Sequence, residues 1–186
     1  MPCCYDGLSA RLIERSGFHL TFMSGFAVAA ARLAAPDTGL LSVGEILDQG
    51  RSILEATHLP VIGDGDTGFG NAANVARTVE SFARAGFAGI MIEDQLAPKR
   101  CGHTRGKEVV DRAEAMDRIR AAVRAREAGA DILIMARTDA RGTHGMEEAL
   151  WRMAAFRDLG ADILFLEAPK TVEEMERFCR SVEGPK

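Results

Sequence analysis

Hydrophobic runs that end in polar residues recur along the chain. In four of them a glycine precedes the run and a polar residue closes it, at residues 17–24, 86–94, 129–137 and 160–167. A fifth run, residues 59–64, lacks the leading glycine but ends in the same way. Nearly continuous apolar runs are typical of parallel strands covered on both faces, and a glycine just after a helix suits a left-handed cap. The pattern therefore predicts parallel strands that follow helices.

Between these strands the apolar residues recur with the period of a helix. Three such stripes are Val75, Val79, Phe82 and Ala83; Met116, Ile119 and Val123; and Met146, Ala149, Leu150, Met153 and Phe156. Three residue pairs have the spacing of a capping box or its acidic variant and predict helix starts. These pairs are Ser42 with Glu45, Thr171 with Glu174, and Asp111 with Glu114. We interpret the stripes as core positions and not as a cofactor site.

Strands that alternate with helices predict a parallel sheet with right-handed crossovers. An open doubly wound sheet and a closed barrel both satisfy this pattern. Polar residues stand at the C-terminal end of almost every predicted strand, namely Ser24, Asp64, Glu93, Arg137 and Glu167. A barrel brings all of these ends around one mouth, whereas an open sheet uses only those at its switch point. We therefore predict an α/β fold of the (β/α)8 TIM-barrel type.

The predicted barrel is incomplete. Including a short strand at residues 1–4, about six strand–helix units are expected, whereas a complete barrel needs eight. The chain ends at residues 184–186, where a seventh strand is expected to start. Either the chain is a fragment or two units are absent, and an incomplete barrel exposes strand edges. We expect one incomplete barrel domain over residues 1–186, with an active-site loop at residues 95–110.

Composition narrows the class of protein. The chain has 186 residues, of which 47% are apolar and 27% charged, as in one ordinary globular domain. Its net charge of −4 gives no reason to bind nucleic acid or an anionic membrane. No apolar run approaches the ~20 residues that span a bilayer, and residues 1–6 lack the features of a signal peptide. The four cysteines form no C-x-x-C pair, so we expect reduced thiols and a cytoplasmic location.

The glycine-rich turn after residue 62 carries Asp64 and Asp66. Its glycines match G-x-G-x-x-G, a spacing found at dinucleotide sites, but two carboxylates would repel a pyrophosphate. Carboxylates on such a turn suit a hard cation, Mg²⁺ or Mn²⁺. Glu93 ends the next strand and would reach the same mouth. We expect one Asp to bind the cation directly, and the other Asp and Glu93 to act through water; a solvated tight turn is the alternative.

The longest strand-to-helix connection, residues 95–110, contains Cys101 among Lys99, Arg100 and His103. Long loops in compact domains are often lids or binding loops. Nearby cations lower the pKa of a thiol, and such a thiol can exchange protons near neutral pH. The basic side chains would also hold substrate carboxylates. The alternative is a solvated basic loop with an incidental cysteine.

Arg137 and Glu167 complete the set of candidate residues. Arg137 ends a strand and can clamp a carboxylate bidentately, while a structural ion pair with Glu167 is the simpler alternative. We interpret His19, His58 and His144 as structural or surface residues.

Together these motifs resemble the isocitrate lyase and phosphoenolpyruvate mutase superfamily. The matching segments are residues 5–12, 24–25, 33–37, 64–70, 92–95, 99–103, 136–139 and 167–168. The string Lys99–His103 is the most specific and is similar to the signature of the lyase branch. The continuation through Lys107 looks more like dimethylmalate lyases and petal-death proteins than like bacterial methylisocitrate lyases.

The resemblance implies a role for each matching residue. The implied metal group is Asp64, Asp66, Glu93 and Asp37, the last in a gating loop. The implied substrate-binding group is Ser24, Gly25, Gly102, Arg137 and Tyr5. The implied catalytic group is Cys101, Lys99, His103, Arg137 and Glu167. Within it, Cys101 would donate a proton to the enolate-type intermediate that cleavage releases.

The resemblance implies a Mg²⁺-dependent carbon–carbon lyase. Its substrate would be a 2-hydroxy di- or tricarboxylate of the 2-methylisocitrate or 2,3-dimethylmalate type, cleaved to an α-keto acid and a carboxylate. The alternatives are an oxaloacetate hydrolase or decarboxylase, a phosphonate mutase and an inactive barrel. Phe22 stands where methylisocitrate lyases have Tyr, so the base would be Tyr5 or a metal-bound group. We expect a completed chain to form a homotetramer.

Overall fold

The sheet contains six parallel strands in the order of the chain. In this computed structural model, which describes residues 1–104 and 106–186, the strands are β1 (Cys3–Cys4), β2 (Thr21–Met23), β3 (Val61–Asp64), β4 (Gly89–Glu93), β5 (Leu133–Thr138) and β6 (Ile163–Leu166). Each strand pairs in parallel with the next one. A doubly wound sheet would reverse its strand order at a switch point. The unbroken order confirms the barrel-type α/β fold with six strand–helix units.

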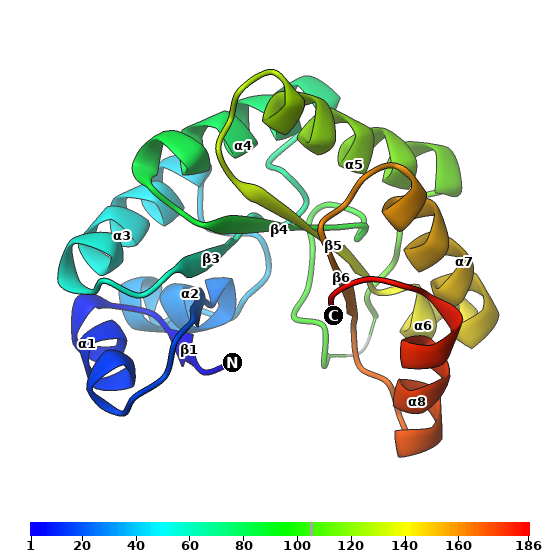
Figure 1. The fold of residues 1–186 in the computed structure, drawn as a ribbon, viewed down its shortest axis with the longest axis horizontal. Coiled ribbons are helices and arrows are strands. Elements are labelled where there is room, and N and C mark those ends of the chain that lie inside the picture. The colour runs from blue at the N-terminus through cyan, green and yellow to red at the C-terminus, as the bar shows by residue number, and fades with distance from the viewer. Residues whose placement is uncertain (105) are drawn as a thin grey trace.

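The helices cover one side of this sheet. They are α1 (Gly7–Arg15), α2 (Gly25–Leu33), α3 (Val43–Ala56), α4 (Ala72–Ala85), α5 (Arg112–Glu127), α6 (Ala140–His144), α7 (Met146–Asp158) and α8 (Val172–Ser181). In Figure 1 most of them form an outer arc with the strands on its inner side. The Leu164 amide donates a hydrogen bond to the Pro185 carbonyl (3.0 Å), so the segment after α8 lies beside β6. Within the described residues, no helix is long and apolar enough to cross a membrane.

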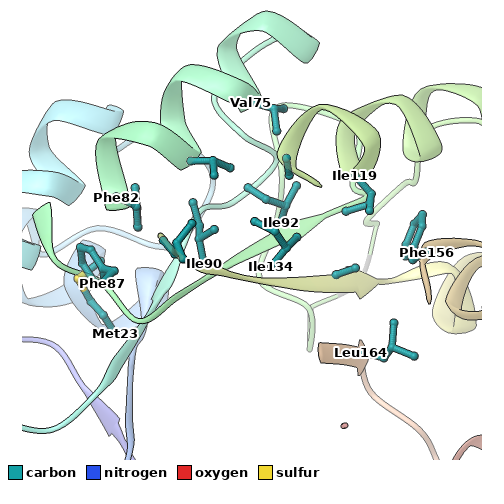
Figure 2. Close-up of a cluster of buried hydrophobic side chains, with 14 of the residues drawn as sticks. Met23, Val75, Phe82, Phe87, Ile90, Ile92, Ile119, Ile134, Phe156 and Leu164 are labelled. Carbon is teal, nitrogen blue, oxygen red and sulfur yellow. The ribbon is translucent and has the colours of Figure 1, made fainter. Parts of the chain in front are cut away.

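The main core lies between the strands and the outer helices. Successive strand residues point to opposite faces, and Ile90, Ile92 and Ile134 point outward and are fully buried. Figure 2 shows them beneath α4 and α5, together with Phe82 and Ile119 from those helices. The helical stripes predicted from the sequence supply this layer, which confirms that they are core positions, except for Met116, which is only half-buried and lies outside the core cluster.

The inner face of the sheet carries a smaller apolar cluster and, above it, charged residues. The cluster consists of Ile62, Met91 and Met135. Phe22 packs against it, which accounts for an apolar residue at that position. Asp64, Glu93 and Arg137 each come two residues after a member of the cluster on the same strand. They therefore lie on the same inner face, at the C-terminal ends of the strands.

Two of the predicted helix starts differ from each other in their capping hydrogen bonds. Ser42 and Glu45 form a complete capping box at the start of α3. At the start of α8, Thr171 accepts a hydrogen bond from the Glu174 amide, as expected. The Glu174 carboxylate, however, does not return a bond to the cap residue. It accepts hydrogen bonds from Arg141, so the prediction of a reciprocal box there was wrong.

Candidate active site

The turn after β3 holds two buried carboxylates at the mouth of the barrel. Asp64 and Asp66 are 6% and 7% exposed. The Asp64 carboxylate accepts hydrogen bonds from the amides of Asp66 and Gly25, each at 3.1 Å. A Cβ atom on Gly25 would lie 2.8 Å from Asp64 Oδ2, so this contact requires glycine. The Gly65 amide donates to the Met91 carbonyl (2.8 Å) and ties the turn to β4.

The ammonium group of Lys99 lies within the predicted metal group. Its Nζ atom is 2.6 Å from Asp37 Oδ1 and 2.7 Å from Asp66 Oδ1. Asp64 and Glu93 also act on its charge. Among the described residues, no three His, Cys, Asp or Glu side chains are placed to ligate one metal ion directly. The structure thus gathers the four predicted carboxylates around a lysine.

Burial makes the charged form of two of these acids unfavourable. Burial, with a further contribution from Asp64, raises the pKa of Asp66 to about 7, against the opposing charge of Lys99. Burial also raises the pKa of Glu93 well above its usual range, although Arg137 opposes this. Burial would lower the pKa of Lys99, but the carboxylates around it, Asp64 first, raise it instead. An additional cation would therefore be stabilised here.

Two oxygens of this cluster indicate where such a cation would be held. Asp66 Oδ1 and Glu93 Oε1 are buried and accept no hydrogen bond from the described residues. The Lys99 ammonium, however, lies 2.7 Å from Asp66 Oδ1 and ion-pairs with it, so Glu93 Oε1 is the oxygen left without a partner among the described residues. Mg²⁺ takes oxygen ligands, keeps several waters and needs only one or two direct carboxylates. The residues present therefore fit Mg²⁺ or Mn²⁺ in their oxygen donors and in the unpartnered oxygen of Glu93.

Arg137 stands at the end of β5 between three carboxylates. Its Nε and Nη2 atoms donate to Asp139 at 2.8 and 3.1 Å. Its Nε atom is 3.2 Å from Glu93 Oε2, and Nη2 is 3.5 Å from Glu167 Oε2. The pairing with Glu167 foreseen as the simpler alternative is thus present, but it is the longest of the three. These contacts hold the guanidinium at the mouth in a fixed orientation.

The loop that follows β4 is anchored by its own side chains and by the segment after α2. The Gln95 amide group donates to the Arg100 carbonyl (2.8 Å) and accepts from the Arg100 amide (3.0 Å). The Cys101 amide donates to the Asp37 carbonyl at 3.1 Å. Cys101 itself is a free, partly buried thiol. The loop therefore ties the backbone of Cys101 to the segment that carries Asp37, one of the predicted metal residues.

Gly102 lies directly against the charged residues of the mouth. A Cβ atom there would be 2.4 Å from Arg137 Nη2 and 2.5 Å from Glu167 Oε1. The next residue, His103, has its Nε2 atom 3.3 Å from the same Glu167 oxygen. The Lys107 ammonium donates to the Gly102 carbonyl at 2.7 Å. Only glycine permits the loop to approach this closely.

Two predicted site residues are less closely connected. Ser24 caps α2 by accepting a hydrogen bond from the Ala27 amide, so its hydroxyl oxygen is engaged in the fold. Tyr5 follows β1 at the same end of the sheet and is 40% exposed. Its phenol forms no hydrogen bond with the described residues. Arg105, part of the stretch that looks like dimethylmalate lyases, lies outside the described residues.

Two further residues of the site were not foreseen from the sequence. Asp139 is fully buried and pairs with both Arg137 and Lys107. Asp94, also buried, follows Glu93 directly and binds the Asp139 amide. The available signal was a second acidic residue just beyond the strand end, in Glu93-Asp94 and in Arg137-Thr-Asp139.

Strands in consecutive order, with a buried acidic cluster at their C-terminal ends, define an α/β-barrel protein with an enzyme-type site at the barrel mouth. A family model described as phosphoenolpyruvate phosphomutase matches residues 1–186, and the chain belongs to this family. It is 46% identical over 183 residues to the 2,3-dimethylmalate lyase of Eubacterium barkeri and 45% identical over 184 residues to a 2-methylisocitrate lyase of Aeropyrum pernix. These alignments cover 98% and 99% of the chain but 63% and 58% of the relatives.

Solved structures that superimpose on this chain belong to the same group of enzymes. A crystal structure of 2,3-dimethylmalate lyase superimposes with a TM-score of 0.95 at 42% identity, over 98% of this chain and 62% of that one. Oxaloacetate acetylhydrolase bound to 3,3-difluorooxalacetate gives 0.94 at 42% identity, over 97% and 62%. Phosphonopyruvate hydrolase bound to oxalate and Mg²⁺ gives 0.86 at 34% identity, over 98% and 63%. The chain thus spans less than two thirds of the proteins it resembles.

Proposed function

We propose that this chain carries the active site of a Mg²⁺-dependent carbon–carbon lyase acting on a 2-hydroxy dicarboxylate of the 2,3-dimethylmalate type. One observation carries the proposal. The loop around Cys101 lies against Arg137 and Glu167, next to a buried cluster of carboxylates. The 46% identity to a 2,3-dimethylmalate lyase supports this choice of substrate class, and 2-methylisocitrate is the nearest alternative.

Asp64, Asp66 and Glu93 would hold the metal, with Asp37 beside them. Mg²⁺ bound there supplies a Lewis acid that stabilises negative charge on a substrate oxygen. The buried Glu93 Oε1, which has no partner among the described residues, supports this assignment. So does the Mg²⁺ in the phosphonopyruvate hydrolase complex, a protein of the same fold.

Cationic side chains would bind the two substrate carboxylates. Arg137 is held rigidly by its carboxylate partners and can meet a substrate carboxylate in a bidentate way. His103 is largely exposed, so it can turn toward the substrate. Gly25, whose amide faces Asp64, and Ser24 would border the substrate on the opposite side.

Cleavage breaks the bond between the hydroxyl-bearing carbon and the carbon next to the second carboxylate. The hydroxyl loses its proton to a base, its oxygen becomes the carbonyl of an α-keto acid, and the bonding pair passes to the other carbon. That carbon is a carbanion stabilised by its carboxylate, and it needs a proton. The Cys101 thiol would donate that proton, which completes a carboxylate product. From 2,3-dimethylmalate the products are pyruvate and propionate.

Product analysis tests the proposal. The chain, incubated with 2,3-dimethylmalate and Mg²⁺, should release pyruvate, and excess EDTA should stop the release. Cys101→Ser should reduce turnover by at least about a hundredfold, in the range that a general acid contributes. Cys179→Ser is the matched control, because Cys179 is an exposed thiol on α8. Full turnover in Cys101→Ser would remove the assigned proton donor.

Oxaloacetate hydrolysis is the second candidate. It is favoured by the close superposition on oxaloacetate acetylhydrolase. Oxalate as the main product from oxaloacetate, without pyruvate from dimethylmalate, would decide for it. Assembly into a homotetramer and a cytoplasmic location stay predictions from the sequence.

A further inference from the structure

A buried acid outside the carboxylate cluster, Asp94, lies directly behind the site. Its side chain points away from that of its neighbour Glu93, toward the outer helices, because successive strand residues alternate. Asp94 Oδ1 accepts the Asp139 amide at 2.9 Å. Asp94 Oδ2 accepts the Thr138 hydroxyl at 2.5 Å and Arg152 Nη1 at 3.0 Å. Three donors from two elements therefore converge on one carboxylate that is 2% exposed.

Arg152 holds this carboxylate from the helix side. It belongs to α7, is 3% exposed, and also donates from Nε to Glu148 at 2.8 Å. Glu148 in turn pairs with Arg112 at 2.6 Å. Because a buried charge is stable only when it is paired and hydrogen-bonded, this chain of ion pairs fixes the position of Asp94 relative to α7.

On the other side, Asp94 leads to the site through Asp139. The Asp139 carboxylate receives two hydrogen bonds from Arg137 and one, at 2.7 Å, from the Lys107 ammonium. Lys107 also donates to the carbonyl of Gly102. Asp94 therefore holds the backbone amide of Asp139, and the Asp139 carboxylate in turn anchors both Arg137 and Lys107, which lies in the second half of the loop.

We propose that Asp94 is a positioning residue: by fixing Asp139 it orients Arg137 and seats the loop that carries Cys101 on the mouth of the barrel. Asp94 itself touches no reacting atom. Its importance for catalysis rests on the proposed function, but its effect on the loop does not require substrate or metal.

The chain contains a second arginine-bound aspartate for comparison, Asp162, whose side chain is 28% exposed. Asp162 also accepts hydrogen bonds from an arginine of an outer helix, Arg126 (2.5 Å), and from a strand amide, that of Ile134 (2.8 Å). It lies at the opposite, N-terminal end of the strands, away from the site. A purely structural contribution would affect both aspartates, whereas a positioning role belongs to Asp94 alone.

The test compares Asp94→Asn with Asp162→Asn in the metal-free chain. Asp94→Asn keeps one acceptor oxygen but cannot serve all three donors. The readout is the rate at which Cys101 reacts with iodoacetamide, followed by peptide mass spectrometry, with Cys179 in the same molecule as the reference. We expect the ratio of the two rates to rise about fivefold in Asp94→Asn, because the loop opens locally more often. In Asp162→Asn it should stay within about twofold of wild type.

Hydrogen exchange gives a second readout, in which the amides of residues 99–104 should lose protection only in Asp94→Asn. Should that variant fail to fold, Lys107→Met removes the last contact in this series, between Asp139 and the Gly102 carbonyl. It should raise the ratio of the Cys101 rate to the Cys179 rate in the same way. Unchanged Cys101 reactivity, or an equal rise in both aspartate variants, would overturn the proposal. Failure of the wild-type chain to bind Mg²⁺ would refute the proposed function instead, and it would leave this readout intact.

Discussion

The ammonium nitrogen of Lys99 lies 2.6 Å from Asp37 Oδ1, so an ion pair joins the loop after β4 to the segment after α2. The Cys101 amide adds a second link to the carbonyl of Asp37. Asp37 thus holds the loop through both its side chain and its backbone. Two segments far apart in the sequence therefore meet beside the acidic cluster.

Lys99→Met is expected to destabilise the metal-free protein by about 3–5 kcal/mol at pH 8, because it leaves the buried Asp66 and the half-buried Asp37 without their cation. Added Mg²⁺ should recover part of this loss, since it binds the folded state and neutralises the same oxygens. Urea unfolding with and without Mg²⁺ measures both effects.

Arg84→Met is the control for that variant. Arg84 pairs with Glu80 on the exposed face of α4 at 3.4 Å, and such a pair contributes no more than about 0.5 kcal/mol. Equal losses in the two variants would contradict the description of Lys99 as the cation that neutralises the cluster.

Gly102→Ala should reduce turnover of the substrate about tenfold or more, because the added methyl group collides with Arg137 and Glu167 and lifts the loop from the mouth. The global stability should change little. Gly44→Ala is the matched control, since a Cβ atom there meets nothing nearer than 3.8 Å and the site lies in a helix. That control should be neutral or more stable by up to about 1 kcal/mol. Steady-state kinetics together with thermal unfolding would separate the two effects, and unchanged kinetics in Gly102→Ala would argue against a closely seated loop.

Stability in mild acid should depend on Glu148. Its hydrogen bonds from Arg112 lower its pKa to about 2, against the opposing effect of burial and with further help from Arg152. In the unfolded chain the pKa is about 4.3. A lowered folded pKa means that the stabilisation is complete above about pH 5 and is lost as the pH falls toward 2.

Glu148→Gln lacks this contribution. We expect it to be less stable than wild type by about 1–2 kcal/mol near neutral pH, with the difference shrinking as the pH falls from about 5 to 3. Urea unfolding at several pH values measures this difference. A constant gap over the whole range would show that the ion pairs around Glu148 do not depend on its charge.

Mg²⁺ should raise the midpoint of thermal unfolding of the wild-type chain, and EDTA should reverse the shift. At a hundredfold excess over Kd the stabilisation is about 2.7 kcal/mol. In Glu93→Gln the midpoint should rise less on adding Mg²⁺, because this variant removes a charge from the buried oxygens that would face the ion. In Glu80→Gln, whose residue lies on an exposed helix face, Mg²⁺ should raise the midpoint as much as it does in wild type. Equal shifts in all three proteins would place the ion elsewhere.

Some features of the fold follow from local physical chemistry. Gly86 takes the left-handed conformation (φ 99°) at the end of α4, as a glycine between a helix and a strand predicts. Helix α2 was not predicted, because its residues are almost all small or apolar and show no polar face. Only its cap, Ser24, carried a signal, and that residue had been interpreted as a strand end.

The sequence by itself determined the barrel-type fold and the gathering of Asp64, Glu93 and Arg137 at one mouth. Periodicity and strand alternation are short-range properties, and parallel strands bring their C-terminal ends together. Only the tertiary structure decided that Lys99 lies among the carboxylates and that Asp139, held by Asp94, anchors Arg137. Such pairings depend on how loops from different strands meet in space, because charges attract one another strongly only when they come within a few ångströms.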